Sequence, residues 1–319
     1  MGKKLELAIG FLNGAVGDYL ARTGNPLATS MTLTDADRPV PADRATLARL
    51  HPGAVATGRV VVLVHGLMCS EHIFDFADGS GDYGRFLQRD LGLAPLYVRY
   101  NTGLPIADNG AALSALLDAV VAHYPGPLTE IVLLGFSMGG LVARAACHVA
   151  ATAPPSRPSP WLPLVSRALY CGTPHRGAPL ERYGRVLAKL LNTIDDPYTQ
   201  LFGQLTDLRS DGVKDLGDAD LRHEDRARRV ARVALRDPEH PVPLLPQIRH
   251  YLVAATFARD PWLIALFGDT IVPLGSATNG ILPLPQDHVH VIPGMHHVAL
   301  AHDARVYEQL VTWLKEGPV

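Results

Sequence analysis

Short apolar runs that alternate with helical segments constrain the fold of this chain more than any other feature. The first run, RVVVLVHG at residues 59–66, is nearly continuous and rich in valine, as in a strand buried on both faces of a sheet. Five similar runs follow at residues 95–100, 130–136, 167–174, 250–257 and 288–294. Helical periodicity occupies residues 105–124, 138–150 and 303–315. This alternation predicts an α/β fold with a mostly parallel central sheet flanked by helices.

Composition sets outer limits on the class of protein. Of the 319 residues, 47% are hydrophobic and 19% charged, which supplies a large core and excludes a mainly disordered chain. The formal net charge of −2 predicts no nucleic-acid partner and no acidic membrane surface as partner. The three cysteines cannot all pair and lack the spacing of a metal site, so we expect reduced thiols in a cytoplasmic protein.

The N-terminal segment opens with a basic pair and then turns apolar. Glu6 interrupts the apolar run early and no A-x-A cleavage site follows, so the segment does not match a signal peptide. Apolar residues at helical spacing predict an amphipathic helix: Leu5, Ile9, Leu12, Val16 and Leu20. Its role stays open between packing on the core and guarding a site or touching lipid. No stretch of the chain reaches the length and apolarity of a membrane span.

The order of the predicted elements divides the chain into three parts. Residues 1–58 form an N-terminal helical extension, and residues 59–180 and 248–319 form the α/β core. Residues 181–247 contain helical patches and a charged run and are too long for a loop, which predicts a mainly helical insertion.

A glycine-flanked serine stands where the strand at residues 130–136 gives way to a helix. The sequence Gly135-Phe136-Ser137-Met138-Gly139 has the G-x-S-x-G pattern of a nucleophile elbow, a sharp turn that holds the serine hydroxyl above the sheet. Glycine on either side relieves backbone crowding in such a turn. The helix that follows favours negative charge at its N-terminus, so Ser137 is the predicted nucleophile.

A serine nucleophile needs a base and an orienting acid, and both are expected after it in chain order. Asp260 and Asp269 follow the fifth predicted strand. We favour Asp269, because the segment GDTIVP offers a polar turn followed by an apolar anchor. Asp260 remains the alternative.

Three histidines after the last predicted strand compete for the role of base. The base is expected on the loop ahead of the final helix. We favour His297, because Leu300 is placed to anchor its loop on the core, over His296 and over His302.

The oxyanion of an acyl-transfer reaction needs two backbone N–H donors. Met138 follows the nucleophile and supplies one, and Leu67 in the loop after the first strand supplies the other. His65 is expected to brace that loop by hydrogen bonds.

Taken together, these residues resemble the α/β-hydrolase family, particularly its lipase and esterase branch. The segments VVLVHGL, GFSMGG, GTPHRGAP, GDTIVP and HHVAL stand in the order that the family shows, from residue 59 to the C-terminus. GTPHRGAP is similar to a segment of bacterial lipases and of inositol deacylases that act on lipid anchors. The insertion at residues 181–247 corresponds in place to the family's cap or lid.

The resemblance implies the α/β-hydrolase fold, a Ser–His–Asp triad, an acyl-enzyme mechanism and no cofactor. We therefore expect a serine carboxylic-ester hydrolase that acts on a small-molecule or lipid-like ester, without nucleic acid and without stable membrane insertion. Acyl transfer and amide hydrolysis use the same triad and stay open.

A ligand-binding or metal-binding protein on the same scaffold is the alternative from another class. His288 and His290 lie two residues apart on a predicted strand and would share a face, as two metal ligands would. Hydrogen-bonded histidines of the strand are the favoured interpretation, and no metal is expected.

Overall fold

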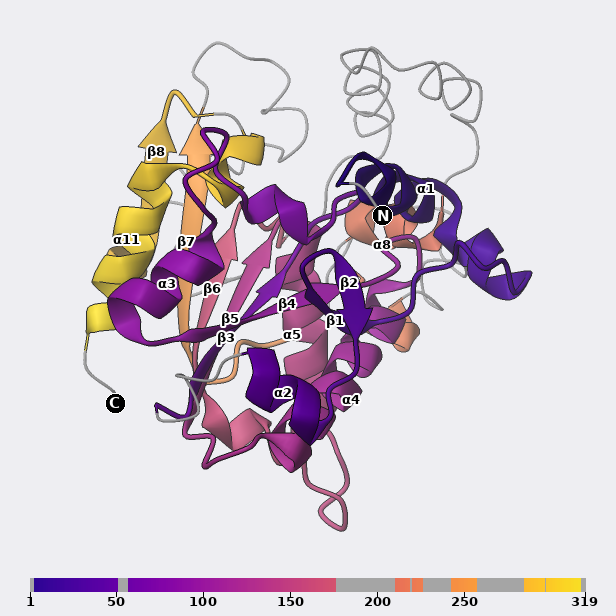
Figure 1. The fold of residues 1–319 in the computed structure, drawn as a ribbon, viewed down its shortest axis with the longest axis horizontal. Helices are drawn as coiled ribbons and strands as arrows, with labels where there is room; N and C mark the ends of the chain where they lie inside the picture. Colours follow the sequence, from indigo (N-terminus) through magenta and orange to yellow (C-terminus); the bar gives the residue numbers. More distant parts are fainter. Residues whose placement is uncertain are drawn as a thin grey trace.

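The computed structural model of the chain describes residues 3–50, 57–175, 210–218, 220–225, 242–256, 284–295 and 297–316. Within these residues, one eight-stranded sheet has the order β2-β1-β4-β3-β5-β6-β7-β8 (Figure 1). Its strands are β1 (Thr32–Asp35), β2 (Arg38–Val40), β3 (Arg59–Val64), β4 (Ala94–Arg99), β5 (Glu130–Phe136), β6 (Val165–Cys171), β7 (Arg249–Thr256) and β8 (Val289–Pro293).

The six strands from β4 to β8 in this order run parallel, which confirms the predicted fold class. β1 pairs antiparallel with both β2 and β4 and thereby extends the sheet. The sequence analysis expected a helical segment before residue 59, whereas the structure adds this hairpin to the sheet. Strands this short carry too little periodicity to be read from sequence.

Helices cover both faces of the sheet. The α-helices of the described residues are α1 (Lys3–Arg22), α2 (Arg44–Leu50), α3 (Tyr83–Leu91), α4 (Ile106–His123), α5 (Met138–Ala151), α8 (Asp211–Asp218) and α11 (Ala304–Lys315). Alternate residues of β3 point to opposite faces: Val60, Val62 and Val64 join the core under α4 and α5, while Val61 and Leu63 join the core under α3 and α11. The two cores therefore lie on opposite sides of one buried sheet.

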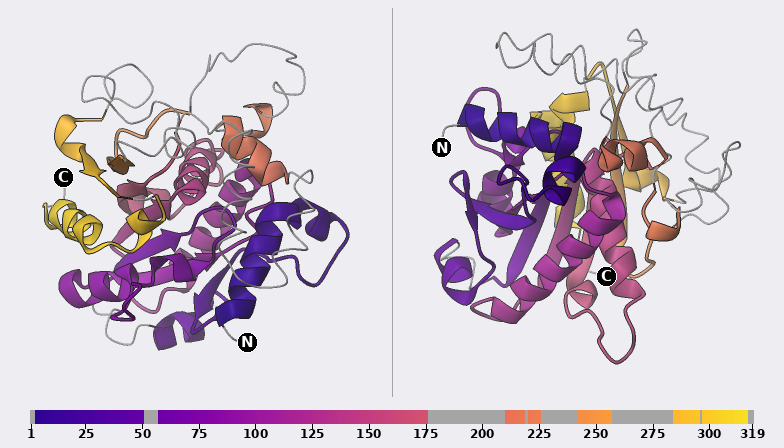
Figure 2. Two further views of the ribbon diagram at one scale, coloured as in Figure 1. Left: turned by 90° about the horizontal axis from the view of Figure 1, so that it is seen from above. Right: turned by 90° about the vertical axis from the view of Figure 1, so that its right-hand side faces the viewer.

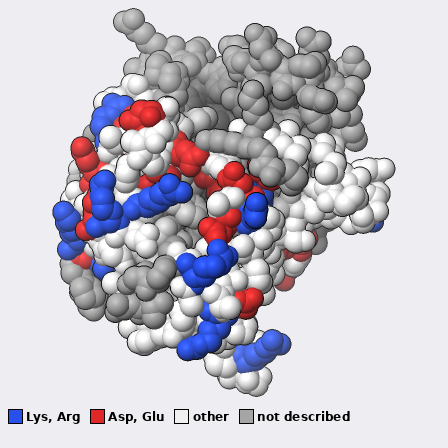
Figure 3. Space-filling view, viewed as in Figure 1, with Lys and Arg blue, Asp and Glu red and all other residues white. Residues whose placement is uncertain are grey.

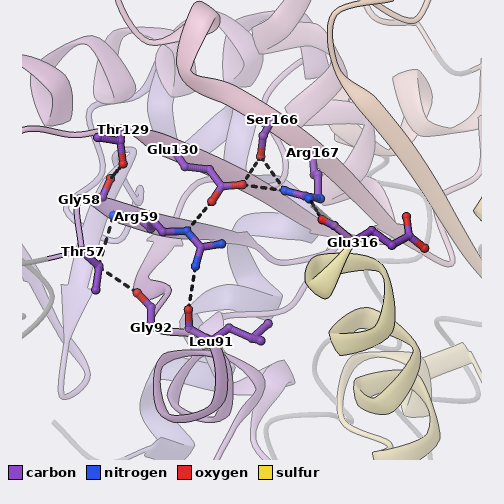
Figure 4. Close-up of polar contacts among 10 residues, drawn as sticks. All are labelled: Thr57, Gly58, Arg59, Leu91, Gly92, Thr129, Glu130, Ser166, Arg167 and Glu316. Carbon is purple, nitrogen blue, oxygen red and sulfur yellow. Dashed lines mark hydrogen bonds and ion pairs between the residues drawn. The ribbon is translucent and has the colours of Figure 1, made fainter. Parts of the chain in front are cut away.

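A polar network joins β3, β5 and β6 at the edge of the sheet where these strands begin (Figure 4). Glu130 Oε2 accepts from Arg59 Nε at 2.5 Å, and Glu130 Oε1 accepts from Arg167 Nη1 at 2.8 Å and from Ser166 Oγ at 2.5 Å. Burial raises the pKa of the Glu130 carboxyl, but these hydrogen bonds and the two arginine charges outweigh that effect and hold it below its ordinary value. We refer to this side as the amino edge.

At the opposite side, which we refer to as the carboxyl edge, the loops after β3, β4, β5 and β6 meet. The N-terminal helix α1 lies across this edge, at the end toward which the strand arrows point (Figures 1 and 2). A bound group at a parallel α/β sheet is expected at this edge, because the strand ends and helix N-termini converge there.

Candidate active site

Ser137 occupies the sharp turn between β5 and α5. Its backbone has φ 52° and ψ −124°, one of four positive φ values among the described non-glycine residues. A side chain in this region costs on the order of 1–3 kcal/mol, and such strain persists only where the surroundings enforce it. The Ser137 N–H donates to the Cys171 carbonyl of β6 at 2.9 Å, which fixes the turn to the neighbouring strand. The residue is 6% exposed.

The glycines around this turn are required by close backbone contacts. A Cβ on Gly135 would lie 2.5 Å from Cα of Gly140, and a Cβ on Gly139 would lie 2.1 Å from the Val64 carbonyl oxygen. A Cβ on Gly66 would lie 3.0 Å from Cβ of Ser137. The glycines of the G-x-S-x-G pattern therefore allow the turn to pack tightly against the end of β3.

His297 begins the short 3₁₀ helix η6 (His297–Ala301), which leads toward α11. Its ring stacks on Phe136, the residue before the serine, with ring centroids 4.9 Å apart. Gly172, at φ 63° after β6, lies against the same ring, since a Cβ there would be 2.7 Å from His297 Cε1. The structure thus brings the predicted base to the loop next to the predicted nucleophile. Burial lowers the pKa of His297 to about 3, so the ring is neutral at physiological pH.

The loop after β3 holds the predicted oxyanion donor Leu67. Among the residues that the structure describes, the N–H groups of Leu67 and Met138 meet no hydrogen-bond acceptor. Met138 is the first residue of α5, where the N–H has no partner within the helix. The next N–H in the loop, that of Met68, donates to Thr102 Oγ1 at 3.1 Å.

His65 braces this loop, as the sequence analysis expected. Its Nδ1 lies 2.9 Å from the Gly66 carbonyl oxygen, its ring stacks on Tyr100 at 4.5 Å, and the Tyr100 hydroxyl donates to the His65 carbonyl at 2.8 Å. Burial lowers the pKa of His65 to about 4, which keeps the ring neutral.

Other predicted residues fall outside the described part of the chain or away from the turn. Asp269, Asp260 and His296 lie outside the described residues, as does most of the insertion at residues 181–247. His302 lies at the far end of η6, where its Nδ1 is 2.9 Å from the Ile73 carbonyl oxygen. His302 Nδ1 therefore contacts the backbone of the 3₁₀ helix η2 (Glu71–Phe74) and not the turn at Ser137.

One group at the carboxyl edge was missed by sequence reasoning. Arg99, at the end of β4, pairs with Glu6 of α1 and with Glu71, which opens the 3₁₀ helix η2 (Glu71–Phe74) just after the Leu67 loop. All three side chains are buried. The available signal was Glu6 itself, an acid inside an apolar helix, which the sequence analysis used only to exclude a signal peptide.

Of the two histidines considered as alternative metal ligands, His288 precedes β8 and is engaged differently. His288 Nδ1 lies 3.0 Å from the His250 carbonyl oxygen and its ring contacts Tyr251. In the described ranges, only Asp37, Glu71 and His72 bring three metal-type atoms within 4.8 Å of one another. Arg99 already binds both carboxylate oxygens of Glu71, and its positive charge opposes a cation there.

With the fold and this geometry established, comparison with known proteins identifies the family. The family model described as "Alpha/beta hydrolase family" matches residues 61–309, so the chain belongs to the alpha/beta hydrolase family. The matched range includes Ser137 and His297. A search of curated proteins finds no match. Within the described residues, no helix combines the length and apolarity needed to cross a membrane.

Several solved structures are similar to this chain. An esterase from Pyrococcus furiosus is 11% identical with a TM-score of 0.48, and the match covers 83% of this chain and 85% of the esterase. A lipase-esterase related protein from Clostridium acetobutylicum is 12% identical with a TM-score of 0.40, covering 80% and 94%. The peroxisomal α/β-hydrolase Lpx1 from Saccharomyces cerevisiae is 14% identical with a TM-score of 0.44, covering 81% and 78%. At identities this low, the activity of a neighbour cannot be assigned to this chain.

Proposed function

We propose that this protein is a serine carboxylic-ester hydrolase of the esterase and lipase type. Ser137 is the nucleophile and His297 is the base. Asp269 is the orienting acid, with Asp260 as the alternative. The backbone N–H groups of Leu67 and Met138 form the oxyanion hole.

The reaction follows from these roles. Ser137 Oγ attacks the ester carbonyl carbon while its proton passes to the neutral His297 ring, and the carbonyl oxygen becomes an oxyanion held by the two N–H groups. The tetrahedral intermediate collapses, the proton passes from His297 to the leaving alcohol, and an acyl-serine remains. Water then attacks the acyl carbon, gives its proton to His297, and the acid is released as Ser137 regains that proton.

The strained turn at Ser137 is the observation that carries this proposal. The turn places a buried serine at a helix N-terminus, and a half-buried neutral histidine stacks on the residue beside it. Two backbone N–H groups, that of Met138 next to the serine in the chain and that of Leu67 in the loop after β3, have no acceptor within the described residues. An acyl-transfer site needs these three features: a nucleophile, a base in its neutral form and donors for negative charge.

A fluorophosphonate probe tests the proposal directly, because it labels an activated serine. Wild-type protein and the variant Ser137→Ala are incubated with the probe, digested and read by mass spectrometry. In parallel, both are assayed on p-nitrophenyl esters with short and long acyl chains. We expect labelling at Ser137, ester hydrolysis by the wild type, and a loss of at least about 1,000-fold in the variant.

The opposite results are equally informative. Hydrolysis that persists at the wild-type level in Ser137→Ala would remove the serine from the mechanism. A wild-type protein that is folded, unlabelled and inactive on all esters would contradict the proposed function. A matched variant, Ser70→Ala, removes a buried hydroxyl from the same edge of the sheet and should keep its labelling at Ser137.

A further inference from the structure

We infer that the N-terminal helix α1 is a positioning element of the oxyanion hole, with Gly14 and Glu6 as its main contact residues. This inference rests on the proposed function, because it concerns the loop that carries the Leu67 donor. It assigns a role in the reaction to a segment that lies outside the range of the family match.

The first observation is the closeness of α1 to the backbone of the oxyanion loop. A Cβ on Gly14 would lie 2.9 Å from both the Cα and N atoms of Met68 and 2.2 Å from its Cγ. A Cβ on Gly10, one turn earlier, would lie 2.8 Å from the Cys69 carbonyl oxygen. Real Cβ atoms essentially never come within 3.0 Å of such neighbours, so only glycine lets the helix lie directly on this loop.

The second observation is that Met68 is strained and held from two sides. Met68 has φ 59°, which a residue with a side chain rarely adopts. Its N–H donates to Thr102 Oγ1 on one side, and Gly14 abuts its Cα on the other. A strained conformation persists only when the surroundings enforce it, and α1 forms part of those surroundings. Since Met68 follows Leu67, this restraint sets where the Leu67 N–H points.

The third observation is that polar contacts tie α1 to the same loops. Arg99 bridges Glu6 of α1 and Glu71 of η2, and the three side chains are 3–9% exposed. Asn101, after β4, donates from Nδ2 to the Gly17 carbonyl at 2.8 Å. A buried ion pair is costly to break on one side, so this bridge resists separation of the helix from the loop.

The orientation of α1 shows that these contacts outweigh apolar burial. The helix turns Glu6 and Asn13 inward, whereas Leu5 is 46% and Tyr19 is 54% exposed. Charged side chains on the viewed face of the molecule gather over α3 and the β1–β2 hairpin (Figure 3). A helix that served only to cover the core would present its apolar residues inward.

Two variants test the inference by different routes. Gly14→Ala inserts a methyl group against Met68, and Glu6→Gln removes the charge that pairs with Arg99. Misplacement of a catalytic donor by a fraction of an ångström to one ångström lowers turnover strongly, so we expect kcat to fall on the order of 10- to 100-fold in Gly14→Ala. The fall in Glu6→Gln should be about 3- to 10-fold. KM should change less than about threefold in both variants, because the substrate contacts are kept.

The variant Gly84→Ala is the matched control. Gly84 lies in α3, where a Cβ would meet the Tyr97 hydroxyl oxygen at 2.3 Å and Pro95 Cβ at 2.6 Å. The substitution and the helical context match Gly14→Ala and the clash distances are similar, but the atoms met belong to side chains and α3 does not contact the oxyanion loop through this residue. We expect a similar loss of thermal stability and a kcat within about twofold of wild type.

Hydrogen–deuterium exchange supplies a readout that needs no turnover. The Met68 and Cys69 amides, which donate to Thr102 Oγ1 and to the Gly66 carbonyl, should exchange faster in Gly14→Ala and in Glu6→Gln than in wild type or Gly84→Ala. Unchanged exchange and unchanged kcat in both α1 variants would overturn the inference. So would an equal fall in kcat in Gly84→Ala, which would indicate general destabilisation. A wild type that hydrolyses no ester contradicts the proposed function instead, while the exchange data still decide whether α1 holds the loop.

Discussion

The amino edge and the carboxyl edge of the sheet differ in how their buried polar groups are hydrogen-bonded. At the amino edge, Glu130 neutralises two arginines, and its carboxylate oxygens accept three hydrogen bonds (Figure 4). At the carboxyl edge, several buried atoms of the described residues lack a hydrogen-bond partner: His65 Nε2, Ser70 Oγ, Thr173 Oγ1 and His175 Nε2. Two strained non-glycine residues, Met68 and Ser137, lie at the same edge.

This difference separates stability from function. Hydrogen bonds that pair both oxygens of a buried carboxylate lower the free energy of the folded state or leave it unchanged, whereas strain and unpaired polar atoms raise it. In a fold whose reactive groups lie at the carboxyl ends of the strands, backbone strain and unpaired polar atoms are expected at that edge. Substitutions at the amino edge should therefore change the free energy of unfolding, and substitutions at the carboxyl edge should change activity.

The largest effect is expected for Ser137→Gly. Activity should fall by at least about 1,000-fold because the nucleophile is lost, while the free energy of unfolding rises by about 1 kcal/mol because glycine accepts the positive φ. Ester hydrolysis and urea unfolding of the same preparation measure both quantities. A loss of stability in this variant would show that the backbone of the turn is not strained.

The reverse result is expected for Glu130→Gln. The substitution leaves Arg167, whose side chain is 3% exposed, without its carboxylate partner, so the free energy of unfolding should fall by about 3 kcal/mol. The kcat of the folded fraction should match wild type, because the contact lies at the far end of β5. Urea unfolding measures the free energy of unfolding, and an ester assay corrected by active-site titration measures kcat. A selective fall in kcat would contradict the proposed difference between the two edges.

Acid should destabilise the protein through its buried neutral histidines. Burial lowers the pKa of both His65 and His250 from 6.5 to about 4 in the folded protein. Below about 6.5 the unfolded chain binds protons that the folded chain does not, so stability is complete above that pH and falls as pH decreases toward 4. Each ring should lower the free energy of unfolding by about 1 kcal/mol near about pH 5.5. Urea titrations at several pH values measure the slope, which should be smaller in His250→Gln; an equal slope would contradict the assignment.

The smallest effects come from two matched hydroxyl deletions. Thr129→Val removes the hydrogen bond from Thr129 Oγ1 to the Gly58 carbonyl at the amino edge, and Tyr100→Phe removes the one from the Tyr100 hydroxyl to the His65 carbonyl at the carboxyl edge. Each should lower the free energy of unfolding by about 1 kcal/mol. Only Tyr100→Phe should also lower kcat, by a few-fold, because His65 borders the oxyanion loop. Equal kcat values in the two variants would remove the functional distinction between the edges.

Much of the fold and part of the candidate site could be predicted from the sequence. The parallel strands are predictable because a strand buried on both faces requires a continuous apolar run, and β3 and β5 both show one. The turn at Ser137 is predictable because its glycines are required by backbone contacts only a few residues apart. The hairpin formed by β1 and β2 was missed because both strands are short and half-exposed.

The two terminal helices show where the limit lies. In α11 the apolar spacing coincides with the buried face, which consists of Val306, Leu310, Trp313 and Leu314. In α1 the same reasoning selects Leu5, Ile9, Leu12, Val16 and Leu20, of which only Leu20 is buried. Its packing face is formed instead by Glu6, Asn13, Gly14 and Gly17.

The sequence is enough to predict the elements whose partners are close in the chain or whose environment is uniform: the buried strands, the amphipathic α11 and the elbow at Ser137. The tertiary structure alone decided which face of α1 turns inward and that Glu6 meets Arg99, 93 residues away. It also decided that His297 stacks on Phe136. The physical reason is that periodicity records the average polarity of an environment, whereas an ion pair or a glycine contact depends on one specific partner that folding brings from a distant part of the chain.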